Sequence, residues 1–259
     1  MQLTRRVFSA IALTAALALS ACGSESDPAG AGQSAYERGS DRGVGSATAA
    51  LTMTEYASVA CGHCAAFHEE VWPMLHDDYI ETGKIRFVFR EMITGSPQFA
   101  IAGFALAHCV APERYFDMID LLFQQQRAIF QAAGEPGGAR GQYLAIARSM
   151  GMSEADFTAC LDNQEINADI VAAHERALAD GIDSTPRFLF NGELLEARRA
   201  PGATDYTYFI GNSQVMIDGE PVLGMVDAAT FRRLIDHLLA RLDADTATDT
   251  GTEAATEQD

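Results

Sequence analysis

The sequence has little positive charge. Its 18 Lys and Arg residues stand against 36 Asp and Glu residues, which gives a formal net charge of −18 at pH 7. Neutralising nucleic-acid phosphates requires clustered Lys and Arg, so this balance argues against DNA or RNA as a partner. We interpret the acidity as a source of solubility.

Long apolar runs are also scarce. The clearest one, residues 7–19, follows Arg5 and Arg6 and is too short for a comfortable membrane span, which is typical of an export signal. It closes on the letters LSAC, which resemble the bacterial lipobox. The resemblance implies that residues 1–21 are removed and that Cys22 carries a lipid anchor to the membrane. An ordinary signal peptide cut near Ala21, which would leave Cys22 as a spare thiol, is the alternative. The letters TRRVF also resemble a twin-arginine export signal, so the export route stays open.

Two segments lack the apolar side chains that a core requires. Residues 22–43 are mostly small and acidic, and Tyr36 is their one large apolar residue, so we expect a flexible tether. Residues 243–259 are acidic and small, and we expect a disordered tail. The folded part should therefore lie within residues 44–242.

The folded part begins with a strand, a helix and a strand. Residues 50–59 are rich in β-branched and apolar types, and residues 84–93 alternate apolar with polar side chains, so both predict core strands. Between them, apolar residues recur every four positions over residues 64–79 and predict a helix, which Pro73 should kink. This order builds a parallel sheet, here the first part of an α/β domain spanning residues 44–94.

The middle of the sequence contains helical patterns alone. Residues 95–181 begin with a good helix start at Ser96 and Pro97, include a capping box from Ser153 to Asp156, and stop at Gly181. Residues 182–242 then predict a short strand after Pro186, a hairpin turning at Asp218 and Gly219, and a final amphipathic helix.

Cysteine is rare, and its number is odd. If the first of the five carries lipid, four remain. Cys61 and Cys64 form a pair by their spacing, which leaves Cys109 and Cys160. In an oxidising compartment these two would form a structural disulfide closing a loop of roughly fifty residues, worth about 3 to 4 kcal/mol. Two separate buried thiols are the alternative.

The stretch EYASVACGHC places a Cys-x-x-Cys motif where a strand gives way to a helix. Unpaired backbone N–H groups and the helix dipole favour negative charge there, so the thiolate of Cys61 should be stabilised. Cys64 lies about one turn inside the helix and should be more shielded. Between them lie Gly62 and His63, and a protonated His63 would stabilise the thiolate further, which makes the disulfide more oxidising.

A metal site is the competing interpretation of these cysteines. A structural zinc site needs four ligands, and the sequence has neither a second Cys-x-x-Cys nor a histidine pair at zinc-finger spacing. We interpret His68 and His76 as surface residues of the helix. We expect no bound metal or other cofactor, although a copper or zinc carrier using Cys61 and Cys64 remains an alternative.

The motif EYASVACGHCAAFHEEVWPML, a helical insertion and the later STPRFLFNGE together resemble the DsbA-like branch of the thioredoxin-fold thiol:disulfide oxidoreductases. The resemblance spans about residues 40–242. It implies an α/β thioredoxin fold with a helical subdomain inserted between the strand-helix-strand unit and the cis-Pro strand. It also implies that Pro186 is cis and, with Thr185, faces the cysteine pair, whereas the residues alone also allow a trans proline that starts a strand.

The resemblance further implies a role for Glu55, which matches the buried acid that accepts the proton of Cys64 in this family. An outward-facing glutamate is the alternative. The sequence departs from the family in two places: Gly62 and His63 replace the usual Pro-His, and residues 193–212 follow Asn191–Gly192 where a tight hairpin is usual. We expect this insertion to leave from the far end of its strand, and the loop at residues 224–226 to border the site.

The resemblance implies an enzyme on the periplasmic side of the bacterial cell envelope. It would introduce disulfides into exported proteins that carry free thiols, and a membrane redox partner would reoxidise it. A disulfide reductase or isomerase of the same fold is the nearest alternative, and a purely structural lipoprotein is another. The short tether leaves no room for a dimerisation domain, so we expect a monomer.

Overall fold

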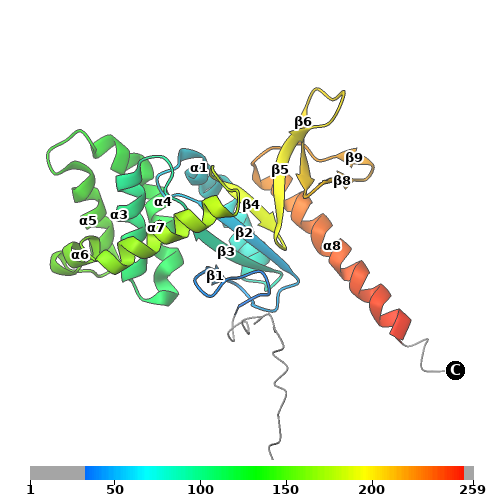
Figure 1. Cartoon of the computed structure of the whole chain (residues 1–259), viewed down its shortest axis with the longest axis horizontal. Coiled ribbons are helices and arrows are strands. Elements are labelled where there is room, and N and C mark those ends of the chain that lie inside the picture. Colours follow the sequence, from blue (N-terminus) through cyan, green and yellow to red (C-terminus); the bar gives the residue numbers. More distant parts are fainter. Residues whose placement is uncertain (1–32, 254–259) are drawn as a thin grey trace, which may run out of the picture.

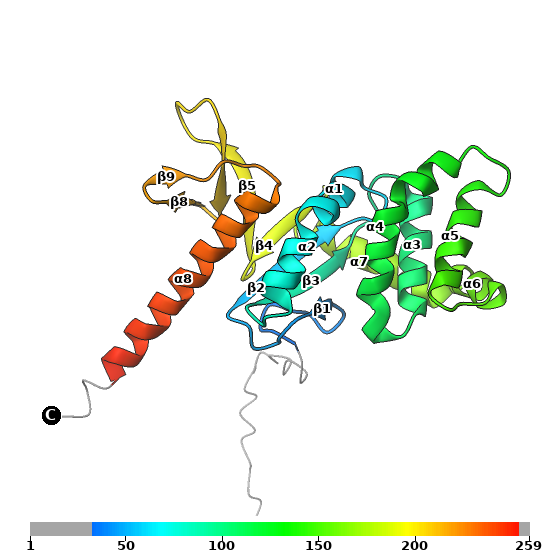
Figure 2. The same cartoon turned by 180° about the vertical axis from the view of Figure 1, so that it is seen from behind.

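The computed structural model describes residues 33–253, so the predicted signal and Cys22 lie outside the described residues. Within that part of the chain, a seven-stranded sheet has the order β1-β3-β2-β4-β5-β6-β7 (Figure 1). The helical subdomain lies beyond one edge of the strands β1 to β4. The long helix α8 lies near β5 (Figure 2).

The interior strand β2 (Leu51–Ala57) pairs in parallel with β3 (Ile85–Glu91) and antiparallel with β4 (Arg187–Phe190). The short β1 (Arg42–Val44) adds to the other side of β3. Every residue of β2 is buried, because helices cover both faces of the sheet. The strand-helix-strand unit, the helical insertion and the cis-Pro strand confirm the predicted fold class.

Neighbouring residues of β2 point to opposite faces of the sheet. Met53 and Ala57 belong to the large core with α1 (Gly62–Glu70) and α8 (Ala228–Glu253). Tyr56 lies in a smaller cluster on the other face, with Ala177 of α7. Glu55 has the parity of Met53, so it enters the large core beneath α1.

The helix predicted over residues 64–79 is broken, not merely kinked. It divides into α1, α2 (Trp72–Leu75) and a π-helix, η1 (His76–Ile80). Pro73 lacks the N–H that would bond the carbonyl of Glu69, and α1 ends just before it. The break places the start of α1 and the aromatic Trp72 on separate short segments.

The inserted subdomain consists of helices within residues 97–179. They are α3 (Pro97–Cys109), the 3₁₀ turn η2 (Pro112–Arg114), α4 (Tyr115–Ala132), α5 (Gly138–Ser149), α6 (Glu154–Leu161) and α7 (Gln164–Ala179). The structure contains the capping box of Ser153 and Asp156 at the start of α6. A disulfide joins Cys109 at the end of α3 to Cys160 in α6.

We expected residues 193–212 to stand in place of the usual tight hairpin, and this expectation is wrong. A tight turn forms at Asn191 and Gly192, both with positive φ, and returns the chain into β5 (Glu193–Arg199), which pairs with β4. The extra length instead forms additional strands. They are β6 (Tyr206–Ile210), β7 (Ser213–Gln214), β8 (Met216–Ile217) and β9 (Glu220–Pro221), the last two a separate hairpin turning at Asp218 and Gly219.

The prediction of a flexible tether is wrong for residues 33–43, the part of that segment that the structure describes. Glu37 forms an ion pair with Arg86 and Asp41 forms one with Arg90, so acids expected to be solvated bind to basic side chains on β3. Residues 42–43 also belong to β1.

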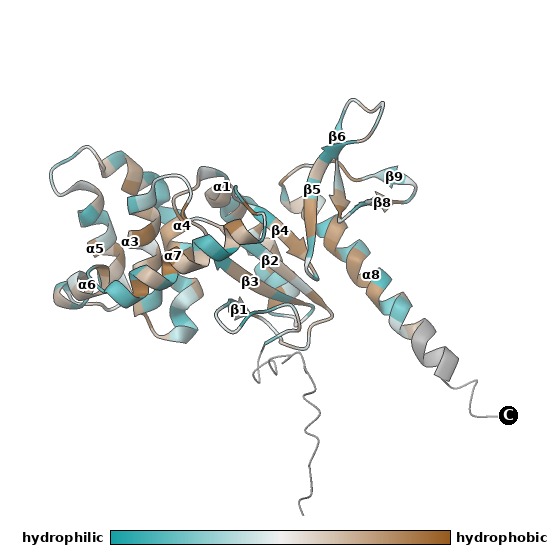
Figure 3. Cartoon of the chain, viewed as in Figure 1, coloured by the Kyte–Doolittle hydropathy of each residue, from teal (hydrophilic) through white to brown (hydrophobic). Residues whose placement is uncertain are grey.

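The expected tail is helical up to Glu253, because α8 continues beyond the part that packs on the sheet. The first half of α8 carries hydrophobic residues among hydrophilic ones, and the next turns, up to the part drawn in grey, are mostly hydrophilic (Figure 3). Residues 243–247 are exposed, so this extension adds nothing to the core.

Candidate active site

Cys61 lies immediately before the first residue of α1. It is the N-cap residue of α1, immediately after the loop that follows β2, and its backbone is extended there. Cys61 is partly exposed and Cys64 is buried, and the two thiols are not bonded to each other. Gly62 and His63, the residues between them, are exposed. The motif therefore presents one accessible sulfur and one shielded sulfur.

The environment of Cys61 favours its thiolate. A hydrogen bond from Cys64 lowers the pKa of Cys61 most; burial opposes this, and Thr185 and the backbone N–H groups of His63 and Cys64 assist, with a result of about 5. The ordinary value is 9.0. Cys61 is therefore a thiolate at neutral pH, and the helix N-terminus supplies part of the reason.

The environment of Cys64 has the opposite effect. Burial raises the pKa of Cys64 well above its ordinary value, and its hydrogen bond to Cys61 and the charge of Glu55 raise it further. The two thiols thus differ in acidity and exposure, as exchange through one attacking and one resolving sulfur requires.

The cis-Pro strand faces the cysteines, as the resemblance implied. The Thr185–Pro186 peptide bond is cis, and the Sγ atom of Cys61 lies 3.5 Å from the carbonyl oxygen of Thr185. The hydroxyl oxygens of Thr185 and Thr94 are 2.6 Å apart, which links this loop to the one after β3. Ser58 donates a hydrogen bond to the carbonyl of Thr94 and so connects both to the loop before Cys61.

Glu55 is buried, as the resemblance implied, and its partner was not predicted. The Oε2 atom of Glu55 lies 2.9 Å from Nε2 of His68, and both side chains are almost fully buried. The prediction of His68 as a surface residue is wrong, because Glu55 and the aromatic side chains around it enclose the imidazole. The amphipathic pattern of residues 64–79 could not show that a buried carboxylate on a neighbouring strand lies beside one of the histidines.

Sequence reasoning also missed Gln126, on α4. Its side-chain amide donates hydrogen bonds to the carbonyl oxygens of Val59 at 2.8 Å and of Cys61 at 3.0 Å. The inserted subdomain thereby holds the loop that carries the exposed sulfur. A buried glutamine on the apolar face of a helix was the available signal, but its contacts are distant in sequence.

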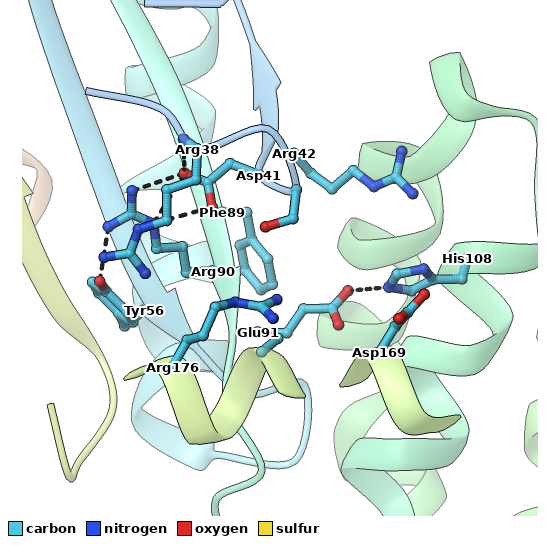
Figure 4. A pocket seen from close by; sticks show the side chains of 12 residues that line it. Arg38, Asp41, Arg42, Tyr56, Phe89, Arg90, Glu91, His108, Asp169 and Arg176 are labelled. Atoms are coloured by element: carbon cyan, nitrogen blue, oxygen red, sulfur yellow. Dashed lines mark hydrogen bonds and ion pairs between the residues drawn. The ribbon is translucent and has the colours of Figure 1, made fainter. Parts of the chain in front are cut away.

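A separate pocket of about 270 Å³ lies where the N-terminal segment meets β3 and α7 (Figure 4). Asp41, Arg90 and Tyr56 form a chain of hydrogen bonds on one side of it, and Glu91 bonds His108 on the other. Neither cysteine of the motif lines this pocket. We interpret the contact of Asp41 with Arg90 as one that secures the N-terminal segment, whereas Glu91 and His108 join β3 to α3.

Two other observations concern residues 33–253. No three His, Cys, Asp or Glu side chains in this part of the chain are grouped as metal ligands would be. The helices described there are all too short or too polar to span a bilayer.

Comparison with known proteins agrees with this geometry. The sequence model of a family described as Thioredoxin matches residues 37–205, more than half of the chain. A protein of Rickettsia conorii named "Putative protein-disulfide oxidoreductase" is 30% identical over 155 residues, which cover 59% of this chain and 53% of that protein. The chain thus spans about half the length of the curated relatives it matches.

Solved structures give the same fold. The alpha-DsbA1 protein of Wolbachia pipientis superposes with a TM-score of 0.62 at 22% identity, covering 82% of this chain and 97% of that one. BdbD from Bacillus subtilis, in its oxidised form, gives 0.56 at 16% identity, covering 77% and 93%. The fold is therefore DsbA-like. Because the family model matches more than half of the sequence, this chain belongs to the thioredoxin family.

Proposed function

We propose that this protein is a thiol:disulfide oxidoreductase that exchanges disulfides through Cys61 and Cys64. The observation that carries the proposal is the difference between the two sulfurs. Cys61 is accessible and acidic, with a pKa of about 5, whereas Cys64 is buried and hard to ionise. The similarity to a protein named as a protein-disulfide oxidoreductase supports this chemistry.

The proposed exchange has two steps. A substrate thiolate attacks Sγ of Cys61 in the Cys61–Cys64 disulfide, forms a mixed disulfide and releases Cys64, which takes up a proton. A second substrate thiolate then attacks the substrate sulfur of the mixed disulfide. Cys61 leaves with its electron pair as a stable thiolate, and the substrate departs oxidised.

The oxidising direction is the one that the site favours. The low pKa of Cys61 stabilises the reduced enzyme, because the sulfur of Cys61 is released as a thiolate when the disulfide is reduced. The Thr185 carbonyl next to Cys61 offers backbone for an extended substrate. We place the enzyme in the cell envelope, held by lipid on Cys22, with exported proteins as substrates and a membrane protein as its oxidant.

The reduction potential tests this direction. We expect equilibration with glutathione to give a potential well above the value of about −270 mV that is found for a strong reductant of this fold. The protein should also speed the oxidative refolding of a reduced substrate, and Cys61→Ser should abolish that activity. A potential near −270 mV with efficient insulin reduction would contradict the oxidase assignment in favour of a reductase.

A further inference from the structure

The buried pair of Glu55 and His68 lies in an apolar part of the core. Glu55 is 0% exposed and His68 is 5% exposed. In the sheet, Glu55 has Phe89 opposite it on β3 and Phe188 opposite it on β4. The ring of His68 stacks on Phe123 with 4.0 Å between centroids. A carboxylate in such surroundings is costly unless a partner holds it, and the imidazole is that partner.

Each member of the pair has one atom without a partner. The hydrogen bond joins Oε2 of Glu55 to Nε2 of His68, while Oε1 of Glu55 and Nδ1 of His68 are buried and make no hydrogen bond. The carboxylate is thus fixed through one oxygen, and its other oxygen is free to accept a proton. A buried orphan acceptor is rare in folded proteins and calls for an explanation.

The groups around the pair indicate where that proton goes. From α1, Cys64 is close enough that the negative charge of Glu55 raises its pKa. From α4, Asp120 interacts electrostatically with both His68 and His76. The residues paired with Glu55 on β3 and β4 are Phe89 and Phe188, which have no titratable group. Cys64 is therefore the buried sulfur with which the pair can exchange a proton.

We propose that His68 is a positioning residue: its imidazole fixes the Glu55 carboxylate through Oε2 and leaves Oε1 to exchange a proton with Cys64, the exchange that the resemblance implies for this acid. The proposal deepens the disulfide exchange proposed above and rests on it. When a substrate thiolate attacks Cys61, the bond to Cys64 breaks and Cys64 leaves with the electron pair. The pair then gives Cys64 its proton, and it recovers that proton when Cys64 becomes the attacking group.

The protein provides its own optical reporter. Trp72 is the one tryptophan of the sequence, and its ring centroid lies 5.2 Å from that of His68. A protonated imidazole quenches indole fluorescence. A change of charge on either nearby imidazole, His68 or His76 with its ring centroid at 5.7 Å, should therefore appear in the emission of Trp72. Because the pair is coupled to Cys64, the pH of this transition should differ between the oxidised and the reduced protein.

The experiment compares three single variants of the full chain. His68→Gln keeps an amide donor for Oε2 of Glu55 but cannot carry the extra proton, and Glu55→Gln removes the acid. His76→Gln is the matched control, because it removes the other imidazole near Trp72, whose ring centroid lies 5.7 Å from the indole and which pairs with Asp77 and not with Glu55. For each, we would record Trp72 emission against pH in both redox states. We would also measure the single-turnover rate of the oxidised protein with a reduced peptide dithiol.

We expect His68→Gln to lose the redox-dependent shift of the Trp72 transition and to slow the single turnover by about tenfold, with an altered pH profile, since positioned proton transfer is typically worth at least this much. His76→Gln removes its own contribution to the emission but should keep the redox-dependent shift and the wild-type rate. If His68→Gln keeps the wild-type pH profile and rate, the proposal is wrong. If His68→Gln does not fold, Glu55→Leu with His68→Phe, which removes both polar partners, should fold and show the slow turnover; a wild-type rate there would also contradict the proposal.

The two proposals fail in different ways. Absence of exchange by the wild-type protein would contradict the proposed function. The redox-dependent shift of the Trp72 transition does not require turnover, so it still tests the coupling between the pair and Cys64. Exchange by the wild type with no such shift would contradict the role of His68 alone.

Discussion

At the scale of single residues, Cys61 and Cys64 show how position alone can separate two identical side chains. Cys61 caps α1 and lies beside the carbonyl of Thr185, whereas Cys64 is enclosed by the core with the charge of Glu55 nearby. The residue types and their spacing predicted this difference, because a helix N-terminus is a local feature. The partner of Glu55 was beyond such reasoning, since it depends on how α1 packs on β2.

The low pKa of Cys61 predicts the pH dependence of its alkylation. The reduced protein should react with iodoacetamide at a rate that falls by half near pH 5, the pKa of this thiol, rather than near the ordinary value of 9.0. Cys64→Ala removes the strongest stabilising hydrogen bond and should move the midpoint upward. A midpoint above about pH 8 in the wild type would show an ordinary thiol.

The same shift predicts how the stability of the reduced protein changes with pH. The folded pKa of Cys61 lies below its unfolded value, so the thiolate contributes its full stabilisation above pH 9.0. That contribution declines as the pH falls and is lost once the pH passes about 5. The oxidised protein has no such thiolate. The difference in free energy of unfolding between the reduced and the oxidised protein, measured by urea titration, should therefore change with pH.

At the scale of helices and strands, most of the fold could be predicted from periodicity. The two core strands, the helical run and the capping box are local patterns, and the structure contains all of them. The β4–β5 hairpin was not predicted, although Asn191 and Gly192 are typical of a tight turn. The segment that follows them, residues 193–212, is longer than the resembled family has there and was interpreted as an insertion. Gln126 could not be predicted, because its contacts join α4 to a loop more than sixty residues earlier.

Gln126 should contribute to the stability of the protein. Gln126→Ala leaves the carbonyl oxygens of Val59 and Cys61 without this donor, so we expect a loss of about 1 to 3 kcal/mol in the free energy of unfolding. Gln125→Ala, at the exposed neighbouring position of α4, is the matched control and should change stability by less than about 0.5 kcal/mol. Urea unfolding measures both, and equal values would mean that Gln126 does not hold the loop.

At the scale of the whole molecule, charge pairs connect the N-terminal segment to the sheet. The sequence is strongly acidic, and the composition alone suggested that these acids are solvated. Instead Glu37 and Asp41 neutralise arginines that project from β3, on the face opposite the large core. Composition cannot reveal this, because a segment with few apolar residues can still be ordered by partners that lie elsewhere in the chain.

The pair of Glu37 and Arg86 should be a major contributor among these contacts. The two side chains are 0% and 10% exposed, so Glu37→Gln removes a buried carboxylate charge that faces a mostly buried guanidinium. We expect a loss of about 3 kcal/mol in the free energy of unfolding. The exposed pair of Arg148 and Glu154 is the control, and Glu154→Gln should cost less than about 1 kcal/mol. Similar losses for both variants in urea titrations would contradict this assignment.

The sheet ends in very short strands at both margins. The outermost strands, β1 and β7, have three and two residues, so each exposes few free backbone groups. Long uncovered margins invite intermolecular strand pairing, and blunt ones resist it. An enzyme of the proposed kind would meet extended segments of its substrate proteins, and these blunt margins would give such segments little backbone on which to nucleate aggregates.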